Sequence, residues 1–385
     1  MVLFDFKYID NTIFSFSMSD SLIDIKCEIH QDSINNSNIK YLPLEFGGES
    51  SSEKLLNWLR HRVIPANRYY VKNFLAKCGL NENDLCGILQ ISYGLSLNDC
   101  YWVCPKSEKR GFAELNLYDN RFSSVLSAIA FTGYGSYQKK TFRSSPEFTT
   151  NGMLAKAWRK QDGKILLYKS GSFGAANSGL EPFSEFYAYQ VAEAMGINAT
   201  NYGLRKWKGK LCSVCELFTS KEKSFIPVGN LLKFNNIESI LDFYKELGND
   251  FYKNLVDMFV FDAVILNQDR HLGNFGFLID NNTNKIISSA PIFDNGLSLF
   301  CYAMDDDIKN YKKYSKTIRP ALYADFDELS MKIMSHRQRK MLSKLVTFKF
   351  KKHSKYNLSQ ERLDFLSFWV REKAKRLIKN NINVS

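Results

Sequence analysis

The chain has 385 residues and a net charge of +12; 45% of its residues are hydrophobic and 14% are aromatic. This composition provides enough apolar surface for two domains or one large bilobal one, and it argues against a disordered protein. No apolar run reaches the roughly 18–20 residues that a membrane-spanning helix needs. The segment Met1–Lys7 also lacks the basic n-region of a signal peptide. We therefore expect a cytoplasmic protein.

Residues 1–135 are predicted to form a separate N-terminal region. Apolar residues at helical spacing predict one helix over residues 52–60 and a second over residues 68–78. The polar segment 81–84 is typical of the N-terminal cap of a helix that begins at Leu85. None of these segments carries a residue pattern with evident chemistry.

Residues 136–220 are predicted to form a nucleotide-binding lobe, because their elements follow in the order hairpin, helix, hairpin. Asp162 and Gly163 provide the turn signal of the first hairpin. Gly196 provides the C-terminal cap of the helix. The predicted strands and helix span residues 154–158, 165–169, 182–195, 202–205 and 211–217. The N-terminal lobe of a protein kinase has this order of elements.

Residues 221–385 are predicted to form a mostly helical lobe, with an apolar run over 251–266 and a final helix over 358–378. Residues 301–385 contain 20 Lys and Arg against 9 Asp and Glu, so they carry nearly all of the net positive charge. A basic C-terminal lobe could attract an acidic macromolecule, phosphorylated ligands or nucleic acid. A solvated surface of a Lys-rich protein is the alternative.

The eight cysteines are scattered, and Cys212 and Cys215 form a CxxC pair inside an apolar, strand-like run. A zinc site would need a second pair or His residues at ligand spacing, and the sequence has neither. We expect reduced, buried thiols rather than metal ligands.

The most informative stretch is residues 265–277, in which Asp269 and Asn274 stand five residues apart between two apolar runs. A second acidic residue, Asp294, follows 20 residues later, and we place it at the end of a strand. In phosphoryl transfer one carboxylate orients the attacking hydroxyl, while an Asn and a second carboxylate hold Mg²⁺ on the phosphates. We therefore predict Asp269 as the catalytic base, and Asn274 and Asp294 as catalytic residues and metal ligands. The alternative is a polar loop with capping roles, in which His271 is a core histidine.

Further candidates lie upstream. Lys169 ends a strand from which its ammonium group can reach the nucleotide phosphates, and Glu185 on the next helix would orient it. Glu216 and Phe218 lie in a segment that would link two lobes and whose main chain would bind adenine. A strand Lys and a helix Glu are otherwise ordinary surface residues, so this interpretation depends on the Asp and Asn residues downstream.

The loop formed by Thr149, Thr150, Asn151 and Gly152 precedes the strand pair that ends in Lys169. We expect this loop to lie over the nucleotide phosphates, where its two hydroxyls could bond phosphate oxygens and become self-phosphorylation sites. The alternative is a tight turn whose Thr side chains satisfy the backbone.

These segments resemble the HipA-like serine/threonine kinases, a branch of the protein-kinase-like superfamily. The resemblance covers residues 144–299, and its most specific part is the segment Asn267–Asn274, whose His271 we group with the nucleotide-binding residues. The resemblance implies an α+β, bilobal protein-kinase-like fold with an extra N-terminal region and a mostly helical C-terminal lobe. It also implies ATP, Mg²⁺ and a protein Ser/Thr acceptor, and it makes the chain a candidate toxin of a toxin–antitoxin pair. The loop predicted to cover the phosphates contains a single Gly, whereas a Gly-rich loop would let the backbone approach the phosphates closely.

Three other functions stay open. A lipid or small-molecule phosphotransferase of the phosphatidylinositol-kinase-like type would share Asp269, Arg270 and His271 with a later Asn. A non-catalytic nucleotide-binding regulatory module is disfavoured because the Lys, Asp, Asn and Asp set is complete. Nucleic-acid binding through the basic C-terminal lobe would show a strong dependence on salt.

Overall fold

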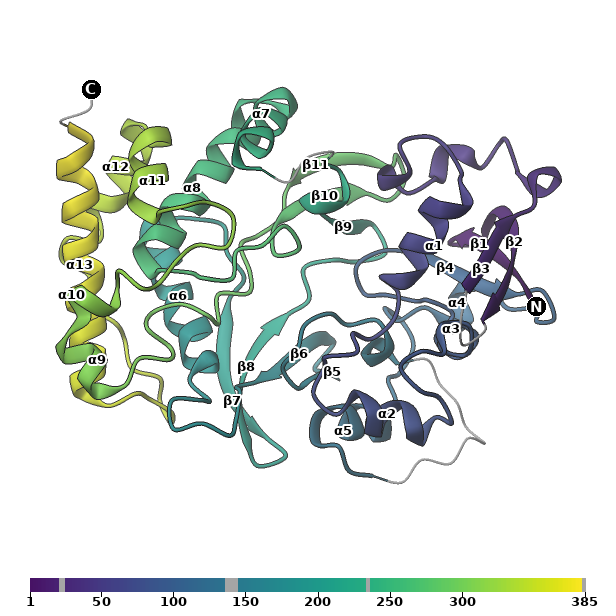
Figure 1. Cartoon of the computed structure of the whole chain (residues 1–385), viewed down its shortest axis with the longest axis horizontal. Coiled ribbons are helices and arrows are strands. Elements are labelled where there is room, and N and C mark those ends of the chain that lie inside the picture. Colours follow the sequence, from purple (N-terminus) through teal and green to yellow (C-terminus); the bar gives the residue numbers. More distant parts are fainter. Residues whose placement is uncertain (21–24, 136–144, 233–235, 383–385) are drawn as a thin grey trace. The chain divides into compact units, whose positions relative to one another are not determined.

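The computed structural model describes residues 1–20, 25–135, 145–232 and 236–382, and Figure 1 labels its elements. The chain divides into two compact units. Unit 1 consists of Met1–Lys169, Leu217–Ile226 and Leu278–Ile287. Unit 2 consists of Ser170–Glu216, Pro227–Phe277 and Ser288–Ser385. The domain boundaries after residues 135 and 220 stay predictions, and residues 136–144 lie outside the described part of the chain. No described helix has both the length and the apolar content to cross a membrane.

Unit 1 contains a four-stranded antiparallel sheet that the sequence analysis does not predict. Its strands, in the order β3-β2-β1-β4, are β1 (Val2–Tyr8), β2 (Asn11–Asp20), β3 (Ile25–Ile29) and β4 (Tyr101–Pro105). Phe4 and Phe6 alternate with outward residues and stack on Phe16 and Phe14, with ring centroids 5.3 and 5.0 Å apart. These rings form the centre of an apolar core.

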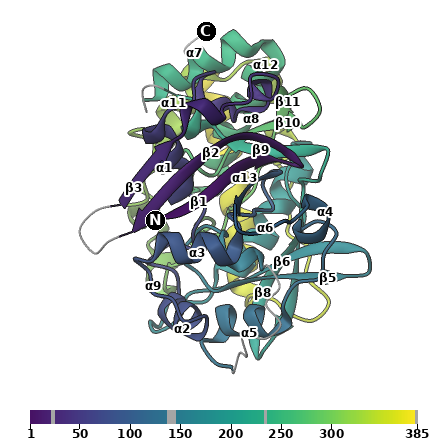
Figure 2. The same ribbon diagram turned by 90° about the vertical axis from the view of Figure 1, so that its right-hand side faces the viewer.

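Helices α1 (Ser52–Arg60), α3 (Leu85–Ser92) and α4 (Phe112–Leu115) contribute residues to this core. Helices α2 (Val71–Lys77) and α5 (Ser124–Thr132) contribute to a second apolar cluster, which also contains Phe148. Figure 2 shows α1 beside β1–β3, and Trp58 on α1 packs edge-on against Phe6. The predicted bounds of α1 are confirmed, as is the cap of α3, where the Asp84 side chain accepts a bond from the Gly87 N–H. The second helix begins at Val71, later than predicted, because Tyr70 has a left-handed conformation with φ +63°.

The first predicted hairpin is confirmed as β5 (Lys156–Gln161) and β6 (Lys164–Ser170). Asp162 and Gly163 both have positive φ, which a two-residue hairpin turn of type I′ requires. Trp158 and Ile165 pack against the core of the N-terminal sheet. A further three-stranded sheet, in the order β11-β10-β9, consists of β9 (Lys223–Pro227), β10 (Gly276–Asp280) and β11 (Lys285–Ser289).

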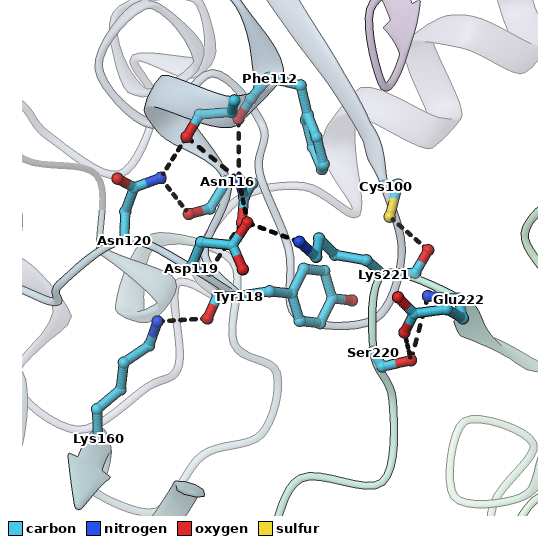
Figure 3. A network of polar contacts seen from close by, with 11 residues as sticks. Cys100, Phe112, Asn116, Tyr118, Asp119, Asn120, Lys160, Ser220, Lys221 and Glu222 are labelled. Carbon is cyan, nitrogen blue, oxygen red and sulfur yellow. Dashed lines mark hydrogen bonds and ion pairs between the residues drawn. The ribbon is translucent and has the colours of Figure 1, made fainter. Parts of the chain in front are cut away.

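A polar network ties the N-terminal region to the segment that follows β8 (Figure 3). Lys160 Nζ donates to the Tyr118 carbonyl at 2.5 Å, and Lys221 Nζ pairs with Asp119 at 2.8 Å. The Cys100 thiol donates to the Lys221 carbonyl at 3.7 Å. The N-terminal region and residues 217–226 are therefore packed as one body.

Unit 2 is mostly helical, and its helices after residue 236 agree with the mostly helical lobe predicted for residues 221–385. Residues 170–216, which were predicted to belong to the nucleotide-binding lobe, are also part of this unit. Its elements are α6 (Glu181–Met195), β7 (Tyr202–Trp207), β8 (Lys210–Glu216), α7 (Ile237–Leu247), α8 (Asn249–Ile265), α9 (Asp305–Lys309), α10 (Tyr311–Tyr314), α11 (Phe326–Ile333), α12 (His336–Ser343) and α13 (Gln360–Ile382). Helix α8 is buried from Leu255 to its end and packs against α7, α11, α12 and α13. Trp369 on α13 donates its indole N–H to the Val264 carbonyl at 2.9 Å. Helix α8 is thus the core element of this unit.

Short 3-10 helices join several of these elements. They are η1 (Gln31–Ser33), η2 (Ile39–Tyr41), η3 (Leu44–Phe46), η5 (Pro146–Phe148) and η6 (Val228–Asn230).

All eight cysteines are free, and all but the half-buried Cys27 are buried. Cys212 and Cys215 lie within β8, and burial raises the pKa of Cys212 to about 12. No group of three or more His, Cys, Asp or Glu side chains gathers at metal-binding distance among the described residues.

A buried carboxylate, Glu147, joins three elements of unit 1. It accepts bonds from the Ser127 hydroxyl at 2.8 Å, from the Trp158 N–H at 3.0 Å and from the Ser145 hydroxyl. Burial raises the pKa of Glu147, and the bonds it accepts oppose that shift. These bonds hold α5, η5 and β5 together.

We predict that Glu147→Ala lowers the free energy of unfolding by at least about 2 kcal/mol, because it leaves buried donors without an acceptor. Urea denaturation followed by tryptophan fluorescence measures this loss. The control is Glu114→Ala, which removes an exposed partner of Arg110 and should change stability by at most about 0.5 kcal/mol. Equal effects of the two changes would contradict the role of Glu147.

Candidate active site

The segment with Asp269 and Asn274 is a tightly bonded loop between α8 and β10 in unit 2. Helix α8 stops at Leu266, which has a left-handed conformation with φ +55°. Within the loop the His271 N–H donates to the Asp269 carbonyl at 2.8 Å, and the Asn274 N–H donates to the His271 carbonyl at 2.9 Å. The loop therefore has a defined shape.

A buried side chain, Arg270, fixes this loop in place. Its Nε and Nη2 donate to both oxygens of Asp262 at 2.9 and 3.0 Å, a bidentate pair in which both residues are at most 1% exposed. Its Nη1 donates to the Asn274 carbonyl at 2.9 Å and to the Phe293 carbonyl at 2.7 Å. Because one nitrogen bonds both carbonyls, the end of the loop and the peptide that precedes Asp294 lie side by side.

Three carboxylates keep Arg270 charged. Burial opposes the charge of the guanidinium, but Asp262, Asp294 and Glu185 raise the pKa of Arg270 above its usual value. Burial raises the pKa of Asp262, and the Arg270 charge opposes that shift. Arg270 is thus a buried positive charge that interacts with the carboxylates of Asp294 and Glu185, two of the predicted functional residues.

Asp269 and Asn274 lie together, as their spacing predicts. The Asn274 side-chain amide donates to the Asp269 carbonyl at 2.9 Å, and the Asp269 N–H donates to the Asn267 side chain at 3.1 Å. Asn274 is buried and Asp269 is half-buried. His271 is exposed, and its Nδ1 accepts a bond from the Gly273 N–H. His271 is therefore not the core histidine of the alternative interpretation.

Asp294 lies in a loop and not at the end of a strand as predicted. Strand β11 ends at Ser289, and Ile292 forms an isolated bridge with Ala199. Asp294 has φ +57°, and its N–H donates to the Tyr202 hydroxyl at 3.2 Å. Pairing stops here because the Phe293 carbonyl and the Asn295 N–H bond to the side chains of Arg270 and Glu185.

Glu185 and Lys169 belong to different units. Glu185 is fully buried on α6 and accepts the Asn295 N–H at 2.7 Å, so it supports the segment that carries Asp294. Lys169 is buried near the end of β6 in unit 1. Their pairing stays a prediction.

The predicted phosphate-covering loop has its hydroxyls bonded within unit 1. Thr149 donates to the Leu95 carbonyl at 2.7 Å, and Thr150 donates to the Pro146 carbonyl at 2.6 Å. Arg68 donates to the carbonyls of Thr150 and Gly152, both at 3.3 Å. These bonds match the tight-turn alternative, and the approach of the loop to a nucleotide stays a prediction.

Asn151 and Gly152 are exposed at the tip of this loop, and Gly152 has φ +91°. A Cβ at Gly152 would also come within 2.1 Å of the Lys156 ammonium, so the position favours Gly.

The predicted linker carries Glu216 and Phe218. Glu216 is exposed at the end of β8, and the chain passes from unit 2 to unit 1 after it. Phe218 packs edge-on against Phe225, with centroids 5.6 Å apart. Adenine binding by this segment stays a prediction.

The supporting roles of Asp262 and Tyr202 were not predicted from the sequence, and Arg270 and Asn295 were named only as parts of motifs, the latter in the segment Phe293-Asp294-Asn295. Asp262 could have been noticed in the sequence, because it is an acidic residue within a long apolar run, which the structure shows to be a buried stretch of helix α8. A buried charge of this kind requires a partner. No such signal marks Tyr202, which is far from Asp294 in the sequence and accepts its N–H in the folded chain.

The loop fixed by Arg270 lies in the part of the chain that matches a known family. Residues 135–361, more than half of the chain, match the family model described as the HipA-like C-terminal domain. The chain therefore belongs to the HipA-like C-terminal domain family.

Among curated proteins, the serine/threonine-protein kinase CtkA of Helicobacter pylori (strain J99 / ATCC 700824) is 30% identical over 172 residues. The match covers 40% of this chain and 49% of CtkA, so the chain spans about half the length of the curated relative it matches.

Two solved structures are similar. A complex of HipA, HipB and operator DNA from Shewanella oneidensis MR-1 gives a TM-score of 0.55 at 10% identity, with 97% of each chain covered. The Helicobacter pylori proinflammatory kinase CtkA gives a TM-score of 0.45 at 19% identity, with 60% of this chain and 94% of that chain covered. The first likeness extends over nearly the whole chain, and the predicted α+β, kinase-like fold class is confirmed.

We predict that Asp262→Asn lowers the free energy of unfolding by about 3–5 kcal/mol, because it leaves the buried Arg270 charge without its partner. The control is Asp242→Asn on α7, which removes an exposed partner of Lys245. Urea denaturation of both variants measures the difference. A loss as small as that of the control would show that Arg270 does not depend on Asp262.

Proposed function

We propose that the chain is an ATP- and Mg²⁺-dependent kinase that phosphorylates a Ser or Thr hydroxyl of a protein. The observation that carries this proposal is the double contact of Arg270, which holds the Asn274 end of the loop against the segment of Asp294. Membership in the HipA-like family supports it, as does the likeness to a relative named as a serine/threonine-protein kinase.

Each residue of the loop has a proposed role. The carboxylate of Asp269 accepts the proton of the attacking hydroxyl and orients it. The side-chain oxygens of Asn274 and Asp294 are hard donors of the kind that Mg²⁺ prefers. The amide nitrogen of Asn274 is held by the Asp269 carbonyl, which leaves its oxygen as the atom for a cation. The residues thus fit Mg²⁺, which when bound neutralises charge on the transferred phosphate.

The remaining nucleotide contacts are proposed from the sequence. Lys169 would contact the phosphates and Glu185 would orient it. The proposed ATP-binding set also contains Thr149, Thr150, Asn151, Gly152, Glu216, Phe218 and His271.

We propose a protein acceptor rather than a lipid, because the curated relative CtkA, which is 30% identical over 172 residues, is named a serine/threonine-protein kinase. Labelled ATP offered with cell lysate in one reaction and with phosphatidylinositol vesicles in another tests this choice. Label on lysate proteins that is absent with Asp269→Ala supports a protein kinase. Label on lipid alone would overturn the choice of acceptor.

An antitoxin-like partner is part of the proposal. The Shewanella oneidensis HipA structure contains HipB and operator DNA. We infer that this chain also binds a small DNA-binding protein, encoded by a neighbouring gene. Co-expression with the products of the adjacent genes, followed by size-exclusion chromatography, tests the inference. A chain that elutes alone in every case would argue against it.

We predict that Asp269→Ala lowers kcat by about 10²–10⁴-fold, because the group that orients the hydroxyl is lost. ATP affinity should stay close to that of the wild type, since Asp269 contacts the acceptor and not the nucleotide. Turnover and calorimetric ATP binding are measured together. The control is Asp250→Ala, an exposed acid in the first turn of α8, which should retain activity. Normal turnover in Asp269→Ala would refute the assignment.

We predict that Asp294→Ala weakens Mg²⁺-dependent nucleotide binding more than Asn274→Ala does. Asp294 brings a full negative charge to the cation, whereas Asn274 brings a carbonyl dipole. Calorimetric titrations with ATP at several Mg²⁺ concentrations measure the difference. If both variants keep the Mg²⁺ dependence of the wild type, neither residue is a ligand.

A further inference from the structure

Unit 2 contains a cavity of about 640 Å³ that no proposed catalytic residue lines. Its walls come from α10 and the segment after it, from the start of α11 and from the middle of α13. Leu266, which ends α8, also lines the cavity. Small-molecule sites in proteins typically have volumes of roughly 300–1,000 Å³, so this cavity has room for a small organic ligand.

The wall is basic. Five of its residues are Lys or Arg and three are Asp or Glu. All three acids have partners. Asp325 pairs with Arg319 at 3.4 Å, Glu372 pairs with Lys375 at 2.7 Å, and Asp327 pairs with both Lys373 and Arg376. Since five cations stand against three acids, the acids neutralise only part of the positive charge of the wall.

Two lysines of the wall have no acidic partner. Lys312 and Lys316 stand four residues apart, are exposed, and form no ion pair within the described residues. The Ser315 N–H donates to the Tyr311 carbonyl at 2.8 Å, so the backbone between the lysines is helical. At this spacing the two side chains lie on one side of the helical turn. Together they offer an anion two charged donors.

The inner part of the cavity also favours a negative charge. The side chain of Lys373 is only 4% exposed and shares the Asp327 carboxylate with Arg376. Two cations thus face one anion there. Burial lowers the pKa of Lys373 to about 8, and the nearby Asp325 opposes that shift. A second anion would stabilise the Lys373 ammonium.

Aromatic side chains complete the wall. Tyr311, Phe326 and Trp369 line the cavity. Tyr311 is half-buried, so part of its ring is accessible. A purely inorganic anion would leave this apolar surface and most of the volume unused, whereas a ring that carries phosphate would use both.

We propose that this cavity is a second ligand site, which binds a small phosphorylated ring compound of the mononucleotide class. Its phosphate lies at Lys312 and Lys316, and its ring lies toward Tyr311. The site is separate from the proposed kinase site and does not depend on its activity. A bound ligand would contact Leu266, three residues before Asp269 in the chain.

The test is a calorimetric titration of the full chain with AMP, with adenosine and with pyrophosphate. EDTA is present, so that Mg²⁺-dependent binding at the kinase site is suppressed. The variants are Lys312→Glu, Lys316→Glu and Lys312→Arg. The matched control is Lys313→Glu, which makes the same charge change on the same helix at a residue that does not line the cavity. Lys169→Met tests whether binding occurs at the kinase site instead, because Lys169 is the residue proposed to contact phosphates there without Mg²⁺.

We expect AMP to bind with one-to-one stoichiometry and more tightly than adenosine or pyrophosphate. Lys312→Glu and Lys316→Glu should each weaken AMP by about tenfold or more, since each replaces a charged donor with an acid. Lys312→Arg, Lys313→Glu and Lys169→Met should stay close to the wild type. Three results would each overturn the proposal: no binding of AMP, an equal loss with Lys313→Glu, or a loss with Lys169→Met. Pyrophosphate bound as tightly as AMP would exclude the mononucleotide class.

Discussion

The candidate active site depends on one buried ion pair, Asp262 with Arg270. A guanidinium enclosed in an apolar core is tolerated only if its donors are satisfied, and here they are satisfied by one carboxylate, two main-chain carbonyls and one side-chain amide. Each bond restrains a different piece of chain: the end of α8, the loop at Asn274, and the segments at Phe293 and Asn295. Lys could not replace Arg here, because an ammonium group lacks the planar fork that reaches partners on several sides. The requirement to satisfy a buried charge thus fixes the position of the candidate catalytic loop.

Unit 1 shows how the extra N-terminal region is connected to the rest of the chain. The stacked rings of β1 and β2 form a core that also takes up Trp158 and Ile165 of the β5–β6 hairpin. Polar contacts add to this, since the Phe225 N–H donates to the Asn98 carbonyl and Lys221 pairs with Asp119. Residues before 135 are therefore a packed part of the unit that carries Lys169, and not an appended module on a linker.

Local patterns explain what the sequence could predict. The Asp162-Gly163 turn, the Asp84 cap and the stop at Gly196 depend on residues within a few positions of one another, and all three occur. The spacing of Asp269 and Asn274 likewise placed them in one loop. The N-terminal sheet was missed although Phe4 and Phe6 alternate and β1 forms a local hairpin with β2. The pairing of β1 with β4, more than 90 residues away in the chain, is non-local and has no such pattern. The contact of Arg270 with Phe293 is also non-local, and no periodicity encodes it.

The basic charge of the C-terminal lobe is not a uniform surface property. Some of these basic side chains make contacts within the lobe. Arg337 pairs with the buried Asp257 of α8, and Lys373 pairs with Asp327. Arg362 donates to the carbonyls of Phe300 and Ala303. These cations hold α12, α11 and α13 in place, and the ion pairs of Arg337 and Lys373 offset part of the charge of the lobe. Lys312 and Lys316 on the cavity wall form no ion pair with any residue that the structure describes, so their charges remain available to a ligand. Their charge can therefore act on an anion that reaches the wall, whereas the lobe's total charge overstates its attraction for a macromolecule.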